Sequence, residues 1–380
     1  MYRNVTVAVV VPAYNESGYV GDVIDGLPDF VDRAYVVDDG STDDTWREII
    51  DHAARRNATH DGRFEDLVVP IEHEENRGVG GAIKTGYQRA REEGLDATAV
   101  LGGDDQMDPT ELKKYLDPIV DGEADYTKGN RFADPAYWAK MPRFRLIGNV
   151  ALSYLTKIAS GYWDSMDSQN GYTAISLDAL ERTDVDGMYE YYGYCNDLLV
   201  RLNAADVEIA DVARSSEYAY TDGWKSHIDY REYVPRVSGM LLRSWLWRLR
   251  RKYLLTRFEP IAPLYALGSS VLGASLLGLL SSVVRRDRDA TGTWVVAVTL
   301  GALTFLAGAI LDREDNRDLT VQIDPATDGP ETADDDQERE SSGPLTRSAS
   351  AVDESRENGD GHRVDTSGVG QAEIRPPEDP

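Results

Sequence analysis

The sequence predicts an α/β domain with a doubly wound, mostly parallel sheet, followed by a two-helix transmembrane hairpin and a disordered acidic tail. Short β-rich runs alternate with amphipathic helical stretches over about the first 130 residues. Two uncharged apolar stretches follow, and the remainder is rich in Asp, Glu, Ser, Gly and Pro. The expected boundaries are 1–235 for the α/β domain, 236–258 for a basic amphipathic interfacial helix, 259–311 for two transmembrane helices, and 312–380 for the tail.

Five strands are expected in the α/β domain, the last with the weakest pattern: Val5–Pro12, Ala34–Asp38, Leu67–Ile71, Thr98–Leu101 and Tyr126–Gly129. Helices are expected over Thr45–Arg56 and Gly81–Glu93. Another helix should start at Asp108, with Asp as its N-cap and Pro109 at its first position. Residues from about 131 to 235 are less regular and rich in Tyr and Trp, which is typical of substrate-binding loops mounted on a scaffold.

A basic amphipathic helix is expected over Leu241–Leu255, just before the apolar stretches. Its apolar face comprises Leu241, Leu242, Trp245, Leu249 and Tyr253. Its cations are Arg248, Arg250, Arg251 and Lys252. Such a helix can lie in the membrane interface with its cations near anionic lipid.

Ile261–Val284 and Trp294–Leu311 contain no charge and approach the roughly 20 residues that cross a hydrocarbon core. Their pairing and their Gly, Ser and Ala content favour a membrane hairpin over two buried core helices. Three arginines of the connecting loop, Arg285, Arg286 and Arg288, oppose the positive-inside rule, whereas the basic helix before the hairpin supports it.

The composition limits the classes of partner. The chain of 380 residues carries 67 Asp and Glu against 40 Lys and Arg, a net charge of −27, which argues against nucleic acid as a ligand. High acidity with little lysine is typical of proteins from a high-salt cytoplasm, so we expect a haloarchaeal origin. The single cysteine, Cys195, excludes an internal disulfide and a cysteine zinc cluster.

Polar residues follow the first two predicted strands. Pro12-Ala13-Tyr14-Asn15-Glu16 ends the first, and Val37-Asp38-Asp39-Gly40-Ser41 ends the second. Ligands of open parallel sheets bind at the carboxyl ends of the strands, where an aromatic ring and carboxylates suit a nucleotide. Together these motifs resemble the opening of the family 2 glycosyltransferases, which have the Rossmann-like GT-A fold. The resemblance implies a nucleotide-sugar site made by Pro12, Tyr14, Glu16, Asp39, Gly78, Lys84 and Asp104.

Within that site the resemblance implies a divalent cation, Mg²⁺ or Mn²⁺, bound by Asp104 and Gln106. Hard oxygen ligands suit these ions, which bridge phosphate oxygens. The family pattern is Asp-x-Asp, but this sequence has Gly102 at the first Asp position. Glycines from Gly78 to Gly81 would let the backbone approach the donor, and Lys84 would meet its diphosphate.

The acceptor side follows from the same resemblance. In the lipid-phosphate branch of the family a Gly-x-Arg motif like Gly129-Asn130-Arg131 is associated with the acceptor phosphate. Asp167-Ser168-Gln169-Asn170-Gly171 resembles the acceptor-side motif, so that the expected acceptor residues are Arg131, Arg145, Asp167, Gln169 and Asn170. The catalytic residues would be Asp104, Arg131 and Asp197, the last lying where relatives carry an acidic pair; here the first acid is Asn196.

The resemblance implies an inverting transfer of a hexose from a nucleotide-sugar to polyprenyl (dolichyl) phosphate, for glycan or glycoprotein assembly. A UDP-glucose-type donor is favoured, with GDP-mannose second. Because the nucleotide-sugar pool is cytoplasmic, we expect a multi-pass protein of the cell membrane with a cytoplasmic catalytic domain. Two alternatives stay open: a lipid-linked oligosaccharide hydroxyl as acceptor, with Asp197 as base, or a non-catalytic membrane-bound GT-A scaffold. The oligomeric state is not indicated.

Overall fold

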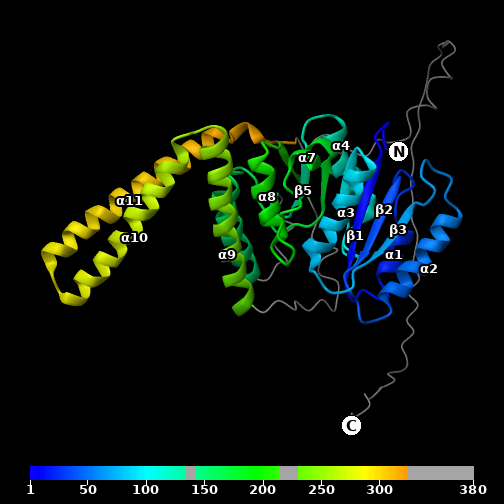
Figure 1. Ribbon diagram of the computed structural model, residues 1–380, viewed down its shortest axis with the longest axis horizontal. Helices are drawn as coiled ribbons and strands as arrows, with labels where there is room; N and C mark the ends of the chain where they lie inside the picture. Colours follow the sequence, from blue (N-terminus) through cyan, green and yellow to red (C-terminus); the bar gives the residue numbers. More distant parts are fainter. Residues whose placement is uncertain (134–142, 214–229, 324–380) are drawn as a thin grey trace, which may run out of the picture. The chain divides into compact units, whose positions relative to one another are not determined.

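The computed structural model describes residues 1–133, 143–213 and 230–323, and the side chains of 143–145 and 230–232 lie outside the described residues (Figure 1). The chain divides into two units, residues 1–327 and 328–380, and the second lies wholly outside the described residues.

One eight-stranded sheet, with the order β3-β2-β1-β4-β6-β5-β7-β8, organises the described residues of the first unit. The strands are β1 (Val7–Ala13), β2 (Arg33–Asp38), β3 (Val68–Glu72), β4 (Ala97–Val100), β5 (Tyr126–Asn130), β6 (Thr173–Ser176), β7 (Ile209–Ala213) and β8 (Thr320–Val321). Only β6 runs antiparallel to its neighbours, β4 and β5. The mostly parallel sheet confirms the predicted fold class, and the five expected strands are present to within two residues at each end.

Helices cover both faces of the sheet, and their bounds are α1 (Val20–Asp25), α2 (Thr45–Ala58), α3 (Val79–Glu93), α4 (Leu112–Val120), α6 (Arg143–Ser160), α7 (Leu177–Arg182) and α8 (Tyr194–Ala204). Alternate residues of β1 point to opposite faces. Val7 and Val9 join a core that includes Val23 of α1, while Ala8 and Val10 join one that includes Leu198 of α8. The predicted N-cap is confirmed, since Asp108 accepts a hydrogen bond from the backbone of Thr110 in a 3-10 turn that leads into α4.

The region from 131 to 235 is more regular than the sequence analysis expected. Its described part contains α6, β6, α7, α8 and β7. Some of its tyrosines are buried in the protein: Tyr162 and Tyr172 are 1% and 0% exposed. The interpretation of the aromatic content as loops holds for only part of the described segment, because large rings such as Tyr162 and Tyr172 also fill the cores.

The predicted interfacial helix is longer than expected, and it exposes fewer of its cationic side chains. α9 (Tyr230–Arg248) continues into a π-helical segment, η3 (Leu249–Thr256). Arg248 and Lys252 are 0% and 2% exposed, and Leu242 is 55% exposed. Two of the four predicted interfacial cations therefore lie inside the protein, and Leu242 lies off the buried face.

Two helices, α10 (Ile261–Arg285) and α11 (Arg288–Asp315), are long and apolar enough to cross a membrane. They lie side by side in Figure 1. A Cβ on Gly268 would lie 2.5 Å from the backbone nitrogen of Phe305, and one on Gly301 would lie 2.7 Å from that of Leu272. Small residues at these positions allow the close backbone approach of a hairpin.

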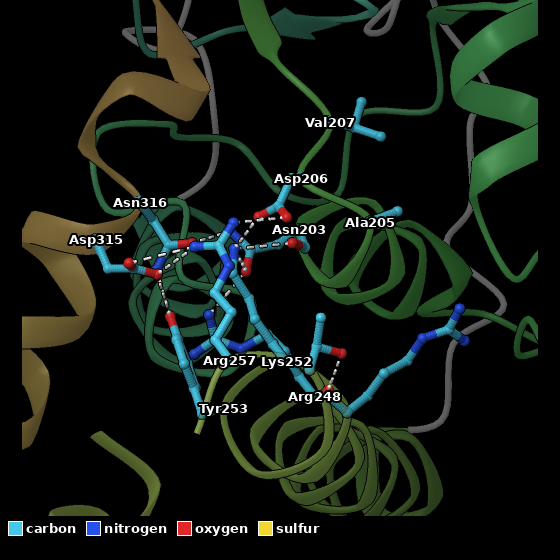
Figure 2. A network of polar contacts seen from close by, with 12 residues as sticks. Asn203, Ala205, Asp206, Val207, Arg248, Lys252, Tyr253, Arg257, Asp315 and Asn316 are labelled. Carbon is cyan, nitrogen blue, oxygen red and sulfur yellow. Dashed lines mark hydrogen bonds and ion pairs between the residues drawn. The ribbon is translucent and has the colours of Figure 1, made fainter. Parts of the chain in front are cut away.

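The ordered chain extends beyond residue 311, where the sequence analysis placed the start of the tail. α11 runs to Asp315, and Thr320–Val321 pair as β8 with β7. Figure 2 shows the polar network at this junction, in which the ammonium of Lys252 donates to Asn203 of α8 at 3.0 Å and to Asn316 at 2.7 Å. The predicted boundary is corrected because α11 and β8 lie beyond residue 311, and Asp312 and Asn316 bond to Arg248 and Asn203. The rest of the predicted tail, 324–380, lies outside the described residues.

Candidate functional site

The predicted motifs meet at one edge of the sheet. β2, β1 and β4 are adjacent and parallel, and β5 runs parallel to them because antiparallel β6 lies between β4 and β5. Backbone hydrogen bonds join the strand ends directly, from Asp39 to the carbonyl of Ala13 at 2.8 Å and from Gly103 to that of Pro12 at 3.1 Å. Four strand ends and the start of β6 therefore form a single surface, as open α/β sheets require of a ligand site.

The turn after β1 presents Tyr14 at this edge. Asn15 has a φ of +56° and donates its backbone N–H to Ser41 Oγ at 2.9 Å. Its side-chain oxygen accepts from the backbone of Thr42, also at 2.9 Å. These bonds tie the turn after β1 to the turn after β2, and Tyr14, 44% exposed between them, is available to a ligand.

The two aspartates at the end of β2 have different roles. Asp38 is 1% exposed and accepts a hydrogen bond from Ser41, which makes it a structural group. Asp39 pairs with His73 Nδ1 at 2.7 Å and accepts from the backbone of Arg77 at 2.9 Å, both through Oδ1. His73 was not among the predicted site residues, although its position directly after β3 places it at the same edge.

The side chains of Glu16 and Asp104 form the acidic centre of the edge. Burial and the negative charge of Asp104, with a further contribution from Asp43, raise the pKa of Glu16 to about 7. Gln106 donates its backbone N–H to Asp104 at 3.2 Å. A Cβ on Gly102 would lie 2.7 Å from Asp104 Oδ1, so glycine at the first position of the family pattern leaves room for that carboxylate.

Two repelling carboxylates fit a divalent cation, whose charge would relieve the repulsion. In the described part of the chain no three side chains of His, Cys, Asp or Glu are grouped so as to hold a metal by themselves. A cation held by Asp104 and Gln106, as predicted, with the Glu16 charge nearby, would therefore complete its coordination with phosphate oxygens and water. Asp105 is exposed and has Asp22 and Asp108 as its charged neighbours, so it does not join this pair.

Lys84, predicted to meet the donor diphosphate, has a protein partner. It is 6% exposed and its ammonium donates to Glu190 at 2.7 Å. Glu190 belongs to the segment Tyr189–Gly193 between α7 and α8, here called the tyrosine loop. A Cβ on Gly78 would lie 2.6 Å from the Glu190 carbonyl. Gly78 and Lys84 therefore hold this loop, and their direct contacts with the donor stay a prediction.

Arg131, Asp167 and Asn170, the residues expected on the acceptor side, lie together. Asp167 and Asn170 support Arg131 in place of contacting an acceptor. The guanidinium of Arg131 binds Asp167 through Nε and Nη2 at 2.8 and 2.7 Å. Asp167 is 0% exposed, so it positions Arg131 and cannot itself touch an acceptor. Asn170 is 3% exposed and donates to Asp167 at 3.3 Å, which makes it a further support of the pair.

Gln169 follows Asp167 in the same motif. Its side-chain oxygen is hydrogen-bonded and, in the described part of the chain, its side-chain nitrogen is not. Its Oε1 accepts from the hydroxyl of Tyr233 at 2.7 Å, while its Nε2 is buried and finds no hydrogen-bond partner within the described residues. A buried amide N–H₂ of this kind is suited to an incoming acceptor oxygen. Arg145 lies in α6, but its side chain lies outside the described residues.

Asp197, predicted as a catalytic residue, is a buried structural carboxylate. It is 1% exposed and accepts from the backbone of Tyr189 at 2.8 Å and from Arg201 Nε at 2.8 Å. Its other oxygen accepts from Ser244 Oγ of α9 at 2.5 Å. With both oxygens engaged, Asp197 links α8 to the tyrosine loop and to α9, and its direct catalytic role stays a prediction that these bonds do not support.

Residues 8–183 match the protein family described as Glycosyl transferase family 2. The UDP-N-acetylglucosamine–dolichyl-phosphate N-acetylglucosaminyltransferase of Methanococcus voltae is 30% identical over 232 residues, covering 59% of this chain and 91% of that protein. The undecaprenyl-phosphate mannosyltransferase of Micrococcus luteus is 28% identical over 210 residues, covering 54% and 81%. A crystal structure of glucosyl-3-phosphoglycerate synthase from Mycobacterium tuberculosis is 19% identical and covers 67% of this chain and 82% of that chain, with a TM-score of 0.45.

Proposed function

The chain belongs to glycosyl transferase family 2, and from this premise we propose that this glycosyltransferase moves a hexose from a nucleotide-sugar to polyprenyl (dolichyl) phosphate. The observation that carries the proposal is the Arg131 guanidinium, fixed by Asp167 at the same sheet edge as Glu16 and Asp104. A rigid fork of N–H donors suits a phosphate oxygen, and the acidic pair suits the cation of a sugar diphosphate.

The engagement of Asp197 supports a phosphate acceptor over a hydroxyl acceptor. A hydroxyl needs a base to remove its proton, whereas a phosphate is already ionised at neutral pH. Asp197 is held by Tyr189, Arg201 and Ser244. The names of the Methanococcus voltae and Micrococcus luteus relatives, which both include a polyprenyl-type phosphate, agree with this choice.

In the proposed reaction the lipid phosphate displaces the nucleoside diphosphate from the anomeric carbon, with inversion. Arg131 orients the attacking phosphate, and the Gln169 amide offers it a second donor. Tyr14 holds the nucleoside at the end of β1, and Asp39, 2% exposed, supports that site at the end of β2 through His73 and the Arg77 backbone. When bound, Mg²⁺ or Mn²⁺ at Asp104 and Glu16, with Gln106 beside them, would neutralise charge on the departing diphosphate.

The membrane side of the proposal rests on exposed apolar side chains and on the hairpin. α6 and α9 expose large apolar residues that are between 52% and 69% exposed, namely Ile147, Tyr154, Leu155, Val234, Leu242 and Leu246. Exposed apolar groups on two neighbouring helices suit the membrane interface. Buried contacts of Asp312 with Arg248 and of Asn316 with Asn203 return the chain to the domain after α11. Both ends of the hairpin would thus lie on the catalytic, cytoplasmic side.

The donor is proposed to be a UDP-hexose, with GDP-mannose as the second candidate. The full chain in membranes, incubated with dolichyl phosphate and labelled UDP-glucose, UDP-N-acetylglucosamine or GDP-mannose, should form a labelled lipid with one of them. EDTA and Asp104→Asn should each abolish most of the labelling. Labelling that survives EDTA would contradict the cation site, and labelling of a lipid-linked oligosaccharide in place of lipid phosphate would contradict the acceptor.

A further inference from the structure

The turn between β3 and α3 lies over the end of β2. The backbone of Arg77 donates to Oδ1 of Asp39 at 2.9 Å. A Cβ on Gly40 would lie 3.0 Å from backbone atoms of both Glu75 and Asn76, and Gly40 has a φ of +75°, which favours glycine. The turn is therefore packed directly on the residues that end β2.

Tyr14 lies on the other side of the same strand end. The backbone of Asp39 donates to the carbonyl of Ala13 at 2.8 Å, and Tyr14 is the next residue of the chain. β1 and β3 are the two neighbours of β2 in the sheet. The end of β2 is thus flanked by the turn that carries Tyr14 and by the turn that leads to Gly78.

The tyrosine loop is attached to the turn on the β3 side. The backbone of Gly81 donates to the carbonyl of Glu190 at 3.0 Å. The Glu190 carboxylate accepts from the ammonium of Lys84 at 2.7 Å and from the guanidinium of Arg77 at 3.1 Å. A backbone bond and two ion pairs therefore fix the loop against this turn and the start of α3.

The ring of Tyr191 is held in place and is still accessible. A Cβ on Gly78 would lie 2.9 Å from Cδ1 of Tyr191, so the ring packs against this glycine, whose φ of +85° other residues rarely adopt. The ring centroids of Tyr191 and Tyr189 are 5.9 Å apart, with the planes at 62°. Tyr191 nevertheless remains 50% exposed. A ring that is fixed by two contacts and otherwise open is pre-organised to pack on a ligand.

We propose that Tyr191 contacts the nucleobase of the donor, from the side of β2 opposite to Tyr14. This rests on the proposed function, which places the nucleoside at Tyr14. Asp39, 2% exposed between the two tyrosines, forms the floor of the site. Aromatic rings stack on the flat face that every base presents. Stacking of this kind does not distinguish uracil from guanine, so the inference holds for either candidate donor.

The test is calorimetry on the full chain in detergent with Mn²⁺, using UDP, UDP-glucose, GDP, GDP-mannose and inorganic pyrophosphate. For the nucleotide that the wild type binds, Tyr191→Ala should weaken the free nucleotide and its sugar conjugate equally, by about three- to tenfold. Pyrophosphate, which has no base, should bind within about twofold of wild type, and Tyr191→Phe should restore nucleotide affinity because it keeps the ring.

Three results would overturn the assignment of Tyr191. Unchanged nucleotide affinity would remove it from the site, and a larger loss for the sugar conjugate would place it at the hexose. An equal loss for pyrophosphate would show a general distortion of the site. A wild type that binds neither UDP nor GDP would instead contradict the proposed function.

A second variant tests the support of the ring. Gly78→Ala sets a methyl group against the Tyr191 ring and should weaken the nucleotide as Tyr191→Ala does. Gly94→Ala, directly after α3, is the matched control: its φ is +68°, and its Cβ meets no atom within 4 Å. If the two glycine variants bound the nucleotide equally well, the packing of Tyr191 on Gly78 would have no part in donor binding.

Discussion

Asp167 holds Arg131 by two parallel hydrogen bonds and also accepts from the Arg131 backbone at 2.9 Å. Burial alone would raise the pKa of Asp167, but the charge and hydrogen bonds of Arg131 lower it to about 2. A depressed pKa means that the pair contributes stability above the unfolded pKa of about 3.9 and loses it only as the pH falls toward 2. The guanidinium thus stays in one orientation throughout the physiological range.

Asp167→Asn should therefore impair the acceptor more than the donor. Asparagine cannot accept both guanidinium bonds, so Arg131 loses its orientation, and the KM for dolichyl phosphate should rise about 10- to 100-fold. Steady-state assays with each substrate varied in turn provide the measurement. Arg131→Lys should show the same selective loss, since an ammonium cannot replace the fork. An equal rise in the donor KM would contradict the assignment.

Glu16→Gln should stabilise the ligand-free protein in a pH-dependent way. The pKa of Glu16 is raised to about 7, so its ionisation opposes folding, and stability decreases as the pH rises from the unfolded pKa of about 4.3 through 7. Glutamine removes this cost, and the Tm at pH 8 should rise by about 2–4 °C while that at pH 4 stays unchanged. Thermal melts of both proteins with EDTA present give the comparison. A lower Tm at pH 8 would show that Glu16 is stabilised as a carboxylate.

Asp197→Asn should act on stability and not on the chemical step. The change breaks a buried pair with Arg201 and sets an amide N–H₂ against the Tyr189 N–H, at a cost of about 3 kcal/mol. Turnover per folded molecule, measured at low temperature and normalised by the folded fraction, should fall by less than about tenfold. A loss of 10²–10⁴-fold in protein that remains folded, as expected for removal of a general base, would favour the hydroxyl acceptor.

Arg248→Met should destabilise the junction between the domain and the hairpin. Arg248 and Asp312 are both 0% exposed and bond at 2.8 Å, so removal of one charge leaves the other buried and unpaired, at a cost of about 3–5 kcal/mol. Chemical denaturation in detergent measures the loss. Arg250→Met, at an exposed position two residues further on, is the matched control. The double variant Arg248→Met with Asp312→Leu should recover part of the lost stability. If the single and the double variant were both as stable as the control, the pair would have no such role.

Local pattern accounts for the strands and for the location of the site. Apolar runs such as Val7–Ala13 have the length and the valine content of buried strands, and the parallel order places the polar residues that follow them at one edge. Tyr14, Glu16, Asp39 and Asp104 follow strands in this way, and their roles toward a donor stay predictions. His73, which bonds Asp39, was not predicted because nothing adjacent to it in the chain indicates which side chain it will face.

The sequence by itself determined the fold class, the family, the edge of the sheet that carries the chemistry, and two helices fit to cross a membrane, because each depends on local periodicity or on motifs at strand ends. The tertiary structure alone decided which charged groups remain available to ligands. Lys84, Asp167 and Asp197 look like ligand residues in the chain, yet they bond inside the protein to Glu190, Arg131 and Ser244, which lie 106, 36 and 47 positions away. A buried charge must find its partner in space, and the identity of that partner is set only when distant segments pack together.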